Sequence, residues 1–348
     1  SPRRCSSRRA RPGRIRSGRC PLPRLFFREA LARALAEELD RDPRIILMGQ
    51  DIGAHGGSYG ETRGLFARFG KERVRDTPVA EAATIGLAAG AAAAGLRPMA
   101  FITYLDFLML GLDPLVNYAA KLRFKSAGQL TAPVVVKTTT GAKGQGPTHA
   151  QCIEPWLMSV PGLTVVAPST AGDAYGLLKT ALRAEGPVVY VDHKELFPKG
   201  GEVPAEETLI PFGQAALRRS GRHVTIVSHS FMSLLTVDAA ALLSKEGIEA
   251  EVLDLRSLWP IDWAALGESV KRTGHVLFVE EGQPVCGVGA ELGFGLRERG
   301  VDAKMARLGA VRAPVAASQA LESFVIPDAA RIAAAARTLL EGRKEVPT

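Results

Sequence analysis

Cysteine and histidine are scarce in this chain, and the few that occur are scattered. The 348 residues include four cysteines and six histidines. Cys5, Cys20, Cys152 and Cys286 form no CxxC pair and have no histidine at the spacing of a zinc site. A disulfide-stapled or zinc-held fold is therefore not indicated. We expect a reducing compartment, which is the cytoplasm, or the mitochondrial matrix if the organism is eukaryotic.

The chain also lacks a convincing membrane span. Residues 79–96 carry no charge except Glu81. They consist mainly of Ala and Gly, which are poorly hydrophobic, and they barely reach the length of about 20 residues that a span requires. We expect neither a membrane-spanning helix nor a secretory signal.

Acidic residues are absent from residues 1–24, which contain nine arginines. Because the whole chain has a formal net charge of +8, the remaining residues sum to −1, and a nucleic-acid partner is not indicated. Ser and Arg with little apolar content cannot bury enough surface to fold, and repeated Pro and Gly oppose an amphipathic targeting helix. We predict a disordered basic arm at 1–24, unless these residues precede the true start of the protein.

Short apolar strands alternate with helices along the rest of the chain. The strands predicted in the first half are 45–48, 98–103, 134–138, 163–167 and 188–192. Those predicted in the second half are 224–228, 250–254 and 276–279. This alternation is typical of mainly parallel sheets covered by helices on both faces. We therefore expect an α/β fold of two doubly wound domains, 25–204 and 205–348, with an edge hairpin within 198–222.

One stretch of small residues, 76–96, contains a single glutamate, Glu81. Thr77 and Pro78 are typical of a helix start, with Thr77 as a cap, so the helix should begin close to Glu81. The Ala and Gly residues that follow remove side-chain bulk, so a backbone or a flat ligand can approach closely. An acid in a first helical turn also complements the helix dipole, and the residues alone leave its role open.

Three stretches, 76–130, 146–182 and 279–292, resemble one known family in the same order. The second contains GPTHAQC and the third reads VEEGQPVCGVGAEL. They resemble the beta subunit of the thiamine diphosphate-dependent decarboxylating component of 2-oxoacid dehydrogenase complexes, a family that includes pyruvate, branched-chain and acetoin dehydrogenases. The resemblance covers about residues 25–345. It implies a pyrimidine-binding domain followed by a transketolase C-terminal-like domain.

The resemblance assigns roles to four residues. Glu81 matches the glutamate that hydrogen-bonds the aminopyrimidine ring of the cofactor and gives general acid–base help there. Phe107 matches the aromatic residue that stacks on this ring, and Thr103 matches a pyrimidine-pocket position where relatives often carry Met or Gln. His149 matches the histidine near the substrate channel, where it is suited to polarise a carbonyl or carry a proton. Without the resemblance, Phe107 would be a core residue and His149 a solvated loop residue.

The family's Gly-Asp-Gly motif for Mg²⁺ and diphosphate is not present, since Gly172 and Asp173 are followed by Ala174. Mg²⁺ normally uses one or two protein carboxylates. The resemblance therefore implies no metal ligands on this chain and an alpha subunit that holds Mg²⁺, in an alpha2beta2 assembly. The glycine-rich segments 141–146 and 287–293 lack the context of phosphate-binding motifs, and we expect turns at both.

The function implied is that of a beta subunit whose component passes an acyl unit to a lipoyl group on a partner acyltransferase. Residues 138–141, TTTG, slightly favour the acetoin members. Two alternatives stay open. The chain could be the carboxyl-terminal half of a split transketolase, which moves a two-carbon ketol between sugars, or a non-catalytic scaffold subunit.

Overall fold

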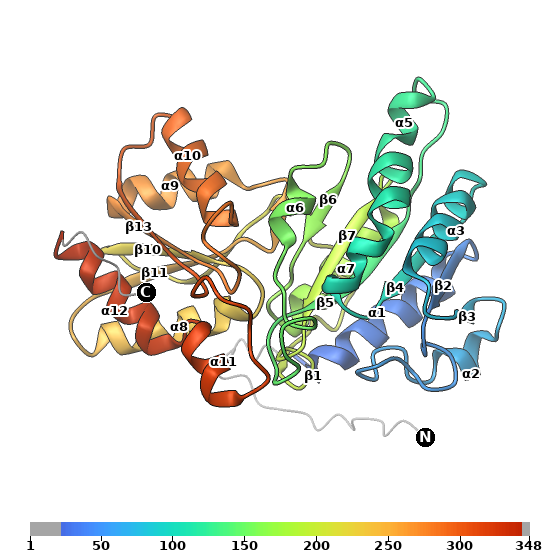
Figure 1. Ribbon diagram of the computed structural model, residues 1–348, viewed down its shortest axis with the longest axis horizontal. Helices are drawn as coiled ribbons and strands as arrows, with labels where there is room; N and C mark the ends of the chain where they lie inside the picture. Colours follow the sequence, from blue (N-terminus) through green and yellow to red (C-terminus); the bar gives the residue numbers. More distant parts are fainter. Residues whose placement is uncertain (1–21, 343–348) are drawn as a thin grey trace, which may run out of the picture.

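Two mainly parallel β-sheets lie side by side with helices around them (Figure 1). The structure, a computed structural model, describes residues 22–342. The order of the larger sheet is β12-β6-β7-β5-β4-β2-β3, and that of the smaller is β14-β13-β10-β11-β9. Within these two sheets of the described residues, the end strands β12 and β9 pair antiparallel with their neighbours and the other strands pair parallel. The expected α/β class with two parallel-sheet units is confirmed.

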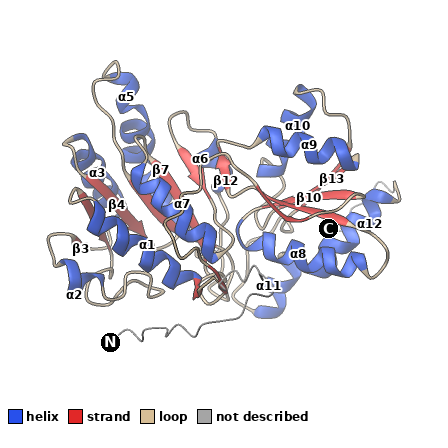
Figure 2. Ribbon diagram, turned by 180° about the vertical axis from the view of Figure 1, so that it is seen from behind, coloured by secondary structure: helices blue, strands red, loops and turns tan. Residues whose placement is uncertain are grey.

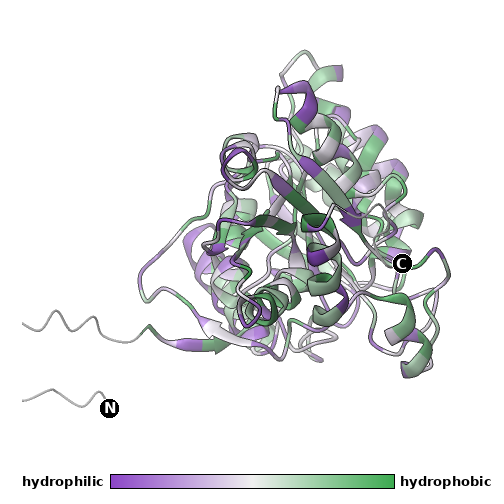
Figure 3. Cartoon of the chain, turned by 90° about the vertical axis from the view of Figure 1, so that its left-hand side faces the viewer, coloured by the Kyte–Doolittle hydropathy of each residue, from purple (hydrophilic) through white to green (hydrophobic). Residues whose placement is uncertain are grey.

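The inner strands of both sheets run almost entirely through buried positions, as uniformly apolar segments require, whereas the end strands β3, β9 and β14 are partly exposed. The larger sheet contains β2 (Ile45–Gly49), β3 (Val74–Asp76), β4 (Arg97–Ile102), β5 (Val135–Thr140), β6 (Thr164–Val166), β7 (Val188–His193) and β12 (Ser257–Trp259). The smaller sheet contains β9 (Ala216–Arg219), β10 (Val224–Ser228), β11 (Ala250–Asp254), β13 (His275–Val279) and β14 (Lys304–Leu308). In Figure 3, green stretches of hydrophobic residues are visible on some of the strands inside the molecule.

The helices cover both faces of each sheet (Figure 2). The larger helices are α1 (Phe27–Arg41), α3 (Glu81–Ala93), α7 (Ala171–Arg183), α8 (Ser230–Ser244), α9 (Trp263–Thr273), α10 (Val288–Glu298) and α12 (Ala329–Leu340). The shorter ones are α2 (Leu65–Phe69), α4 (Leu105–Leu108), α5 (Leu122–Lys125), α6 (Glu154–Met158) and α11 (Gln319–Val325). Between α4 and α5 lie η1 (Met109–Gly111), η2 (Asp113–Tyr118) and η3 (Ala119–Lys121), of which η2 is a π-helix.

The alternation of side chains along β2 shows how the larger sheet is covered. Ile46 and Met48 pack in one core with α3 and the helical segment 105–125. Ile45 and Leu47 pack in a second core with α1 and α7. Successive residues of a strand face opposite sides, so each face of the sheet has its own helical layer. In the smaller sheet α8 and α12 share a core on one face, while α9 and α10 cover the other.

The structure differs from the sequence-based expectation within 198–222. No hairpin forms there: β8 (Gly200–Glu202) pairs with β1 (Arg24–Phe26), whereas β9 pairs with β11. The Pro- and Gly-containing connection carries the chain from one sheet to the other, so neighbours in sequence are not neighbours in a sheet. The short strand β12 was not expected, and it returns to pair with β6 of the larger sheet.

Helix α3 begins at Glu81 as expected, but Thr77 does not cap it. The N-cap position is Ala80, which provides no side-chain cap, because the helix begins four residues after Thr77. Thr77 instead accepts a hydrogen bond from the hydroxyl of Thr84 at 3.4 Å. The first N–H groups of α3 therefore have no side-chain partner from the capping position.

The structure describes the two ends of the chain only in part. Of the predicted basic arm, 1–24, residues 1–21 lie outside the described residues, and Arg24 is the first residue of β1. The predicted division near Pro204 stays a prediction. Within residues 22–342 no helix is long and apolar enough to cross a bilayer, and α3, where the small-residue run lies, has 13 residues.

An ionic network joins the two sheet units. Asp173, in the first turn of α7, binds Arg218 of β9 and lies 3.4 Å from the guanidinium of Arg256. Arg218 also donates to the buried carboxylate of Asp254 at 2.7 Å. Burial raises the pKa of Asp254, and the Arg218 charge opposes this rise. Arg218 thus neutralises two carboxylates that come from different halves of the chain.

We predict that Arg218→Met lowers the free energy of unfolding by about 3 to 5 kcal/mol at pH 7, since it leaves buried carboxylates without their main cation. The loss should be smaller at pH 5, because Asp254 then takes up a proton more readily. Urea unfolding at both pH values measures this. The control is Arg219→Met, whose ion pair with Glu249 is partly exposed to solvent, and it should have little effect. Equal losses in the two variants would contradict the prediction.

Candidate active site

Glu81 stands at the start of α3 without a partner. Its side chain is half-buried and makes no hydrogen bond or ion pair with any residue of 22–342. Its carbonyl oxygen would lie 3.3 Å from a Cβ atom added to Gly111, and the Ile85 side chain would clash with that atom. Glycine at position 111 therefore allows η1 to pack directly on the first turn of α3. This contact brings the segment that carries Phe107 next to the helix that Glu81 begins.

Three rings meet after the end of β4. The ring centroids of Phe107 and His149 are 5.2 Å apart and nearly perpendicular. Tyr104 lies 5.0 Å from His149 and 6.0 Å from Phe107, again edge to face. Two residues singled out from the sequence are thus in contact, and Tyr104 was missed. Its position directly after a parallel strand, where ligand sites of α/β sheets form, was the available signal.

A buried lysine holds the loop that carries His149. Lys194 is fully buried, and its ammonium donates to the carbonyl of Gly141 at 2.8 Å and to the carbonyl of His149. It also lies 4.7 Å from the centre of the Tyr104 ring. Burial lowers the pKa of Lys194. Gly141 has φ +95°, and a Cβ there would overlap the His193 ring, so only glycine fits.

Thr103 lies beside a different hollow. This small hollow is lined by Thr103, Tyr59, Glu61, Lys137 and other residues, but not by Glu81, Phe107 or His149. The Tyr59 hydroxyl is buried there without a hydrogen-bond partner among the described residues. The expected role of Thr103 in a pyrimidine pocket stays a prediction.

A buried charged cluster borders this hollow, and Glu61, Lys137 and Thr139 line it. The Lys137 ammonium lies 2.9 Å from a carboxylate oxygen of Glu61 and 3.1 Å from one of Asp192. Thr139 donates to the second oxygen of Asp192 at 2.7 Å. Burial raises the pKa of Asp192 to about 6 although Lys137 opposes it. Burial also opposes ionisation of Glu61, but the Lys137 charge holds the pKa of that carboxyl below its usual range.

A second pair of polar side chains makes contact between the two sheet units. His193, at the end of β7, lies 2.7 Å from Glu281, which follows β13. Glu281 also accepts from the backbone N–H of Ala142 at 2.7 Å. The resembling stretch VEEGQP thus packs against the loop that carries His149. Neither contact was predicted, because each joins residues far apart in the sequence.

Turns were predicted at both glycine-rich segments, and the structure agrees with this prediction at only one of them. Residues 141–146 form a loop, as expected. Residues 287–293 do not form a turn but lead into and open α10, and the buried Glu280 carboxylate accepts from the N–H groups of Val288 and Gly289 at 3.0 and 3.2 Å. Because a protein carboxylate already occupies this helix start, it has no free donors for a phosphate. Within 22–342, no group of three or more His, Cys, Asp or Glu side chains is placed to hold a metal ion.

Comparison with known sequence families defines the class. Residues 24–199 match "Transketolase, pyrimidine binding domain", and residues 213–332 match "Transketolase, C-terminal domain". A solved structure described as "Split gene transketolase, inactive beta4 tetramer" is 26% identical, with a TM-score of 0.71, and the match covers 90% of this chain and 98% of that one. The fold is therefore of the two-domain transketolase type.

Curated relatives define the family more closely. The acetoin:2,6-dichlorophenolindophenol oxidoreductase subunit beta of Cupriavidus necator is 40% identical over 335 residues, covering 92% of this chain and 99% of that protein. The mitochondrial pyruvate dehydrogenase E1 component subunit beta-2 of Oryza sativa subsp. japonica is 40% identical over 321 residues, covering 90% and 85%. The chain belongs to the family of beta subunits of acetoin and pyruvate dehydrogenase E1 components, which confirms the resemblance.

The buried cluster of Lys137, Glu61 and Asp192 predicts how the free energy of unfolding depends on pH. Since the pKa of Asp192 is raised in the fold, its contribution is fully present at low pH and is lost as the pH rises from about 4 to about 6. Over this pH range, the free energy of unfolding of the wild type should fall relative to that of Asp192→Asn. The fall should be roughly 1.4 kcal/mol for each unit by which the pKa is raised. Urea unfolding between pH 4 and 8 measures it. Asp238→Asn, at an exposed position of α8, is the control. A difference between wild type and Asp192→Asn that does not change with pH would contradict the assignment.

Proposed function

We propose that this chain is the catalytic beta subunit of a thiamine diphosphate-dependent 2-oxoacid or acetoin dehydrogenase component. The observation that carries the proposal is the contact of Phe107 with His149 beside the helix that begins at the unpartnered Glu81. An acid, a flat apolar ring and an imidazole are the three groups that the family's chemistry requires of this chain. Family membership at 40% identity supports the same function.

The residues present fit the cofactor's pyrimidine end. Ala82, Ala83 and Gly90 are exposed on α3 and offer no bulk that would keep a planar group away. The carboxylate of Glu81 is free to exchange a proton with a ring nitrogen, since no residue of 22–342 competes for it. When bound, thiamine diphosphate supplies a nucleophilic carbon that adds to a ketone carbonyl.

Each residue of the site has a distinct role in this proposal. Glu81 holds the proton that is shared with the pyrimidine ring. Phe107 provides a stacking face, and such a contact is worth about 0.5 to 1.5 kcal/mol beyond its burial. His149 polarises the substrate carbonyl or carries a proton, and Lys194 fixes the loop on which His149 lies. Thr103 borders the pyrimidine pocket.

An alpha subunit completes the site. Val79 and Leu87, before and on α3, are exposed, as are Leu110 and Phe124 on the helical segment that follows β4, and these apolar side chains suit a protein interface better than water. We assign Mg²⁺ and the diphosphate mainly to that subunit, in an alpha2beta2 assembly. The acyl acceptor is a lipoyl group on a partner acyltransferase, and the compartment is the cytoplasm or the mitochondrial matrix.

A split transketolase is the second candidate, because a solved structure with that description shares the fold at 26% identity. Assays with the co-expressed alpha subunit separate the candidates. Lipoamide reduction with pyruvate, a branched-chain 2-oxoacid or acetoin supports the first function and identifies the substrate. Ketol transfer between sugars supports the second, and the absence of both activities supports a scaffold subunit.

Glu81→Gln should lower turnover of the assembled complex by about 10² to 10⁴, since the amide cannot exchange the proton. Assembly with the alpha subunit should be unchanged, and light scattering measures the mass of the complex. Glu268→Gln, at an exposed position of α9, is the matched control and should keep full activity. Turnover of the Glu81→Gln complex at the wild-type rate would show that the assigned role is wrong.

Phe107→Leu should weaken binding of thiamine diphosphate by about 2-fold to 10-fold, because the aliphatic side chain keeps apolar contact but loses the flat face. Isothermal titration calorimetry, in which the cofactor is added to the purified complex, measures the dissociation constant. The control is Phe69→Leu, a half-buried ring on α2. Equal affinities in the wild type and Phe107→Leu would remove Phe107 from the cofactor site.

A further inference from the structure

Asp106 is a buried carboxylate that joins the two segments of the candidate site. It lies in α4, directly before Phe107, and is 4% exposed. Its Oδ1 atom accepts from the backbone N–H of Gln151 at 3.1 Å and from the side-chain amide of the same residue at 3.0 Å. One carboxylate oxygen thus connects the helix of Phe107 with the chain two residues after His149.

The backbone next to His149 is held by side chains of opposite charge. Lys194 donates to the carbonyl of His149, and Asp106 accepts from the N–H of Gln151. These groups belong to the two successive peptide units that flank the buried Ala150. Hydrogen bonds to charged groups are stronger than those between neutral groups. The two charges also act on each other, because burial lowers the pKa of Lys194 and the nearby charge of Asp106 opposes this effect.

The loop before His149 does little to fix the imidazole. Gly141, Gly144 and Gly146 all have positive φ angles, and glycine gives a loop more conformational freedom than other residues do. The Nδ1 atom of His149 lies 3.0 Å from the hydroxyl of Thr148, but Thr148 is exposed and belongs to the same loop. The position of the ring therefore depends on contacts from outside the loop.

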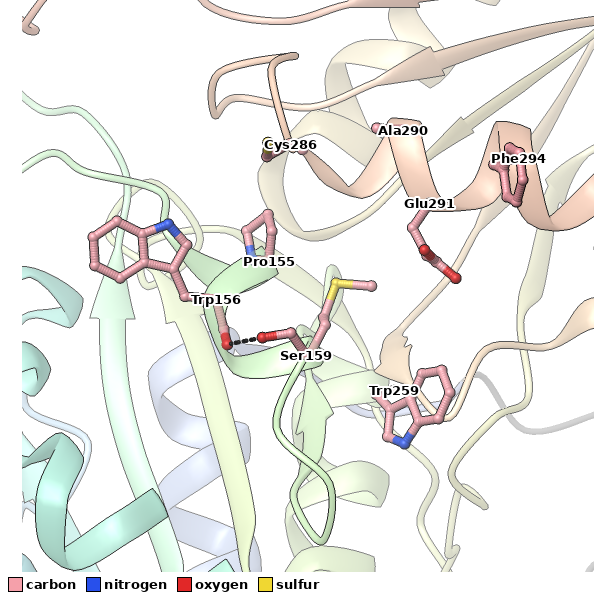
Figure 4. Close-up of a pocket in the computed structure, with 10 residues that line it drawn as sticks. Pro155, Trp156, Ser159, Trp259, Cys286, Ala290, Glu291 and Phe294 are labelled. Atoms are coloured by element: carbon pink, nitrogen blue, oxygen red, sulfur yellow. Dashed lines mark hydrogen bonds between the residues drawn. The ribbon is translucent and has the colours of Figure 1, made fainter. Parts of the chain in front are cut away.

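The chain after Gln151 also gives limited support. It leads into α6, which has only five residues. On the side of α10, this helix borders a hollow that Pro155, Trp156 and Ser159 line, and Trp156 is 55% exposed (Figure 4). A short helix with one open side is a weak anchor. The carboxylate in α4 is therefore the main polar contact on the carboxyl side of His149.

The second oxygen of Asp106 has no such contact. Oδ2 is buried and has no hydrogen-bond partner among the described residues. A buried carboxylate oxygen without a donor lowers the stability of the fold. Groups that are unfavourable for stability are expected at functional sites.

We propose that Asp106 is a positioning residue, which holds the imidazole of His149 against the ring of Phe107 through Gln151. The two rings are in edge-to-face contact, with centroids 5.2 Å apart. Asp106 is the sequence neighbour of one ring and is hydrogen-bonded to the chain of the other, so it sets the spacing between them. The inference rests on the proposed function, since it takes His149 to be used in turnover.

Hydrogen exchange of the purified full chain, followed by mass spectrometry, tests this contact without cofactor or substrate. Asp106→Ala should speed exchange at the Gln151 amide about tenfold, because the amide loses its acceptor. Asp106→Asn keeps a neutral acceptor and should speed it less than threefold. Asp238→Ala, at an exposed position of α8, is the control. Unchanged exchange at Gln151 in Asp106→Ala would overturn the proposal.

Far-UV circular dichroism shows whether each variant is folded. If Asp106→Ala is not, Asp106→Leu takes its place, because the leucine side chain fills the volume with apolar atoms and also removes the acceptor.

Turnover of the complex with the alpha subunit gives the second readout. Asp106→Ala should lower kcat about tenfold or more, because the imidazole is misplaced. The dissociation constant of thiamine diphosphate should stay within about twofold, since the buried Leu105 and Leu108 still fix the helix of Phe107. Asp106→Asn should recover most of kcat, because its oxygen still accepts from Gln151.

Two results with an active complex would overturn the proposal. One is a wild-type kcat in Asp106→Ala, which would leave Asp106 with a structural role alone. The other is an equal loss of kcat in the Asn and Ala variants, which would show that the hydrogen bonds do not set the position. Absence of turnover in the wild-type complex would instead refute the proposed function, and the exchange rates would then decide whether Asp106 fixes this segment.

Discussion

The close packing of α3 against the helical segment that follows β4 is the constraint on which the site depends. It places the unpartnered Glu81 next to the segment of Phe107, and the missing side chain of Gly111 leaves room for this contact. The same choice of small residues has a cost. An Ala- and Gly-rich helix buries little apolar surface of its own, and side chains on it such as Leu87 are exposed. In the proposed function, binding of a planar cofactor and dependence on a second chain would share one physical origin.

Buried charged side chains hold the strands and loops that carry the candidate site. Lys137 neutralises Glu61 and Asp192, and Lys194 holds two backbone carbonyls of the loop that carries His149. Such groups are costly to desolvate and are tolerated only when each charge has well-placed partners. The strict geometry fixes the loops at the carboxyl ends of β4, β5 and β7. Through these contacts the imidazole of His149 lies against the rings of Tyr104 and Phe107.

The sequence predicted the sheets well because apolar strands that are buried on both faces leave a continuous signal, and β10 and β11 have the predicted bounds. The resemblance singled out Phe107 and His149 separately, and their contact was not predicted, since no local pattern joins two residues so far apart. Tyr104 and Lys194 were missed because their importance lies in tertiary contacts. The same reason explains β12, whose three residues acquire strand geometry only by pairing with β6.

The most direct test of the central claim is a structure of this chain bound to its alpha subunit and thiamine diphosphate. The account predicts that the Glu81 carboxylate lies within hydrogen-bond distance, about 2.6 to 3.2 Å, of a nitrogen of the pyrimidine ring, which stacks on Phe107. A complex in which the Glu81 carboxylate faces water, or in which the ring binds away from the start of α3, would contradict the account.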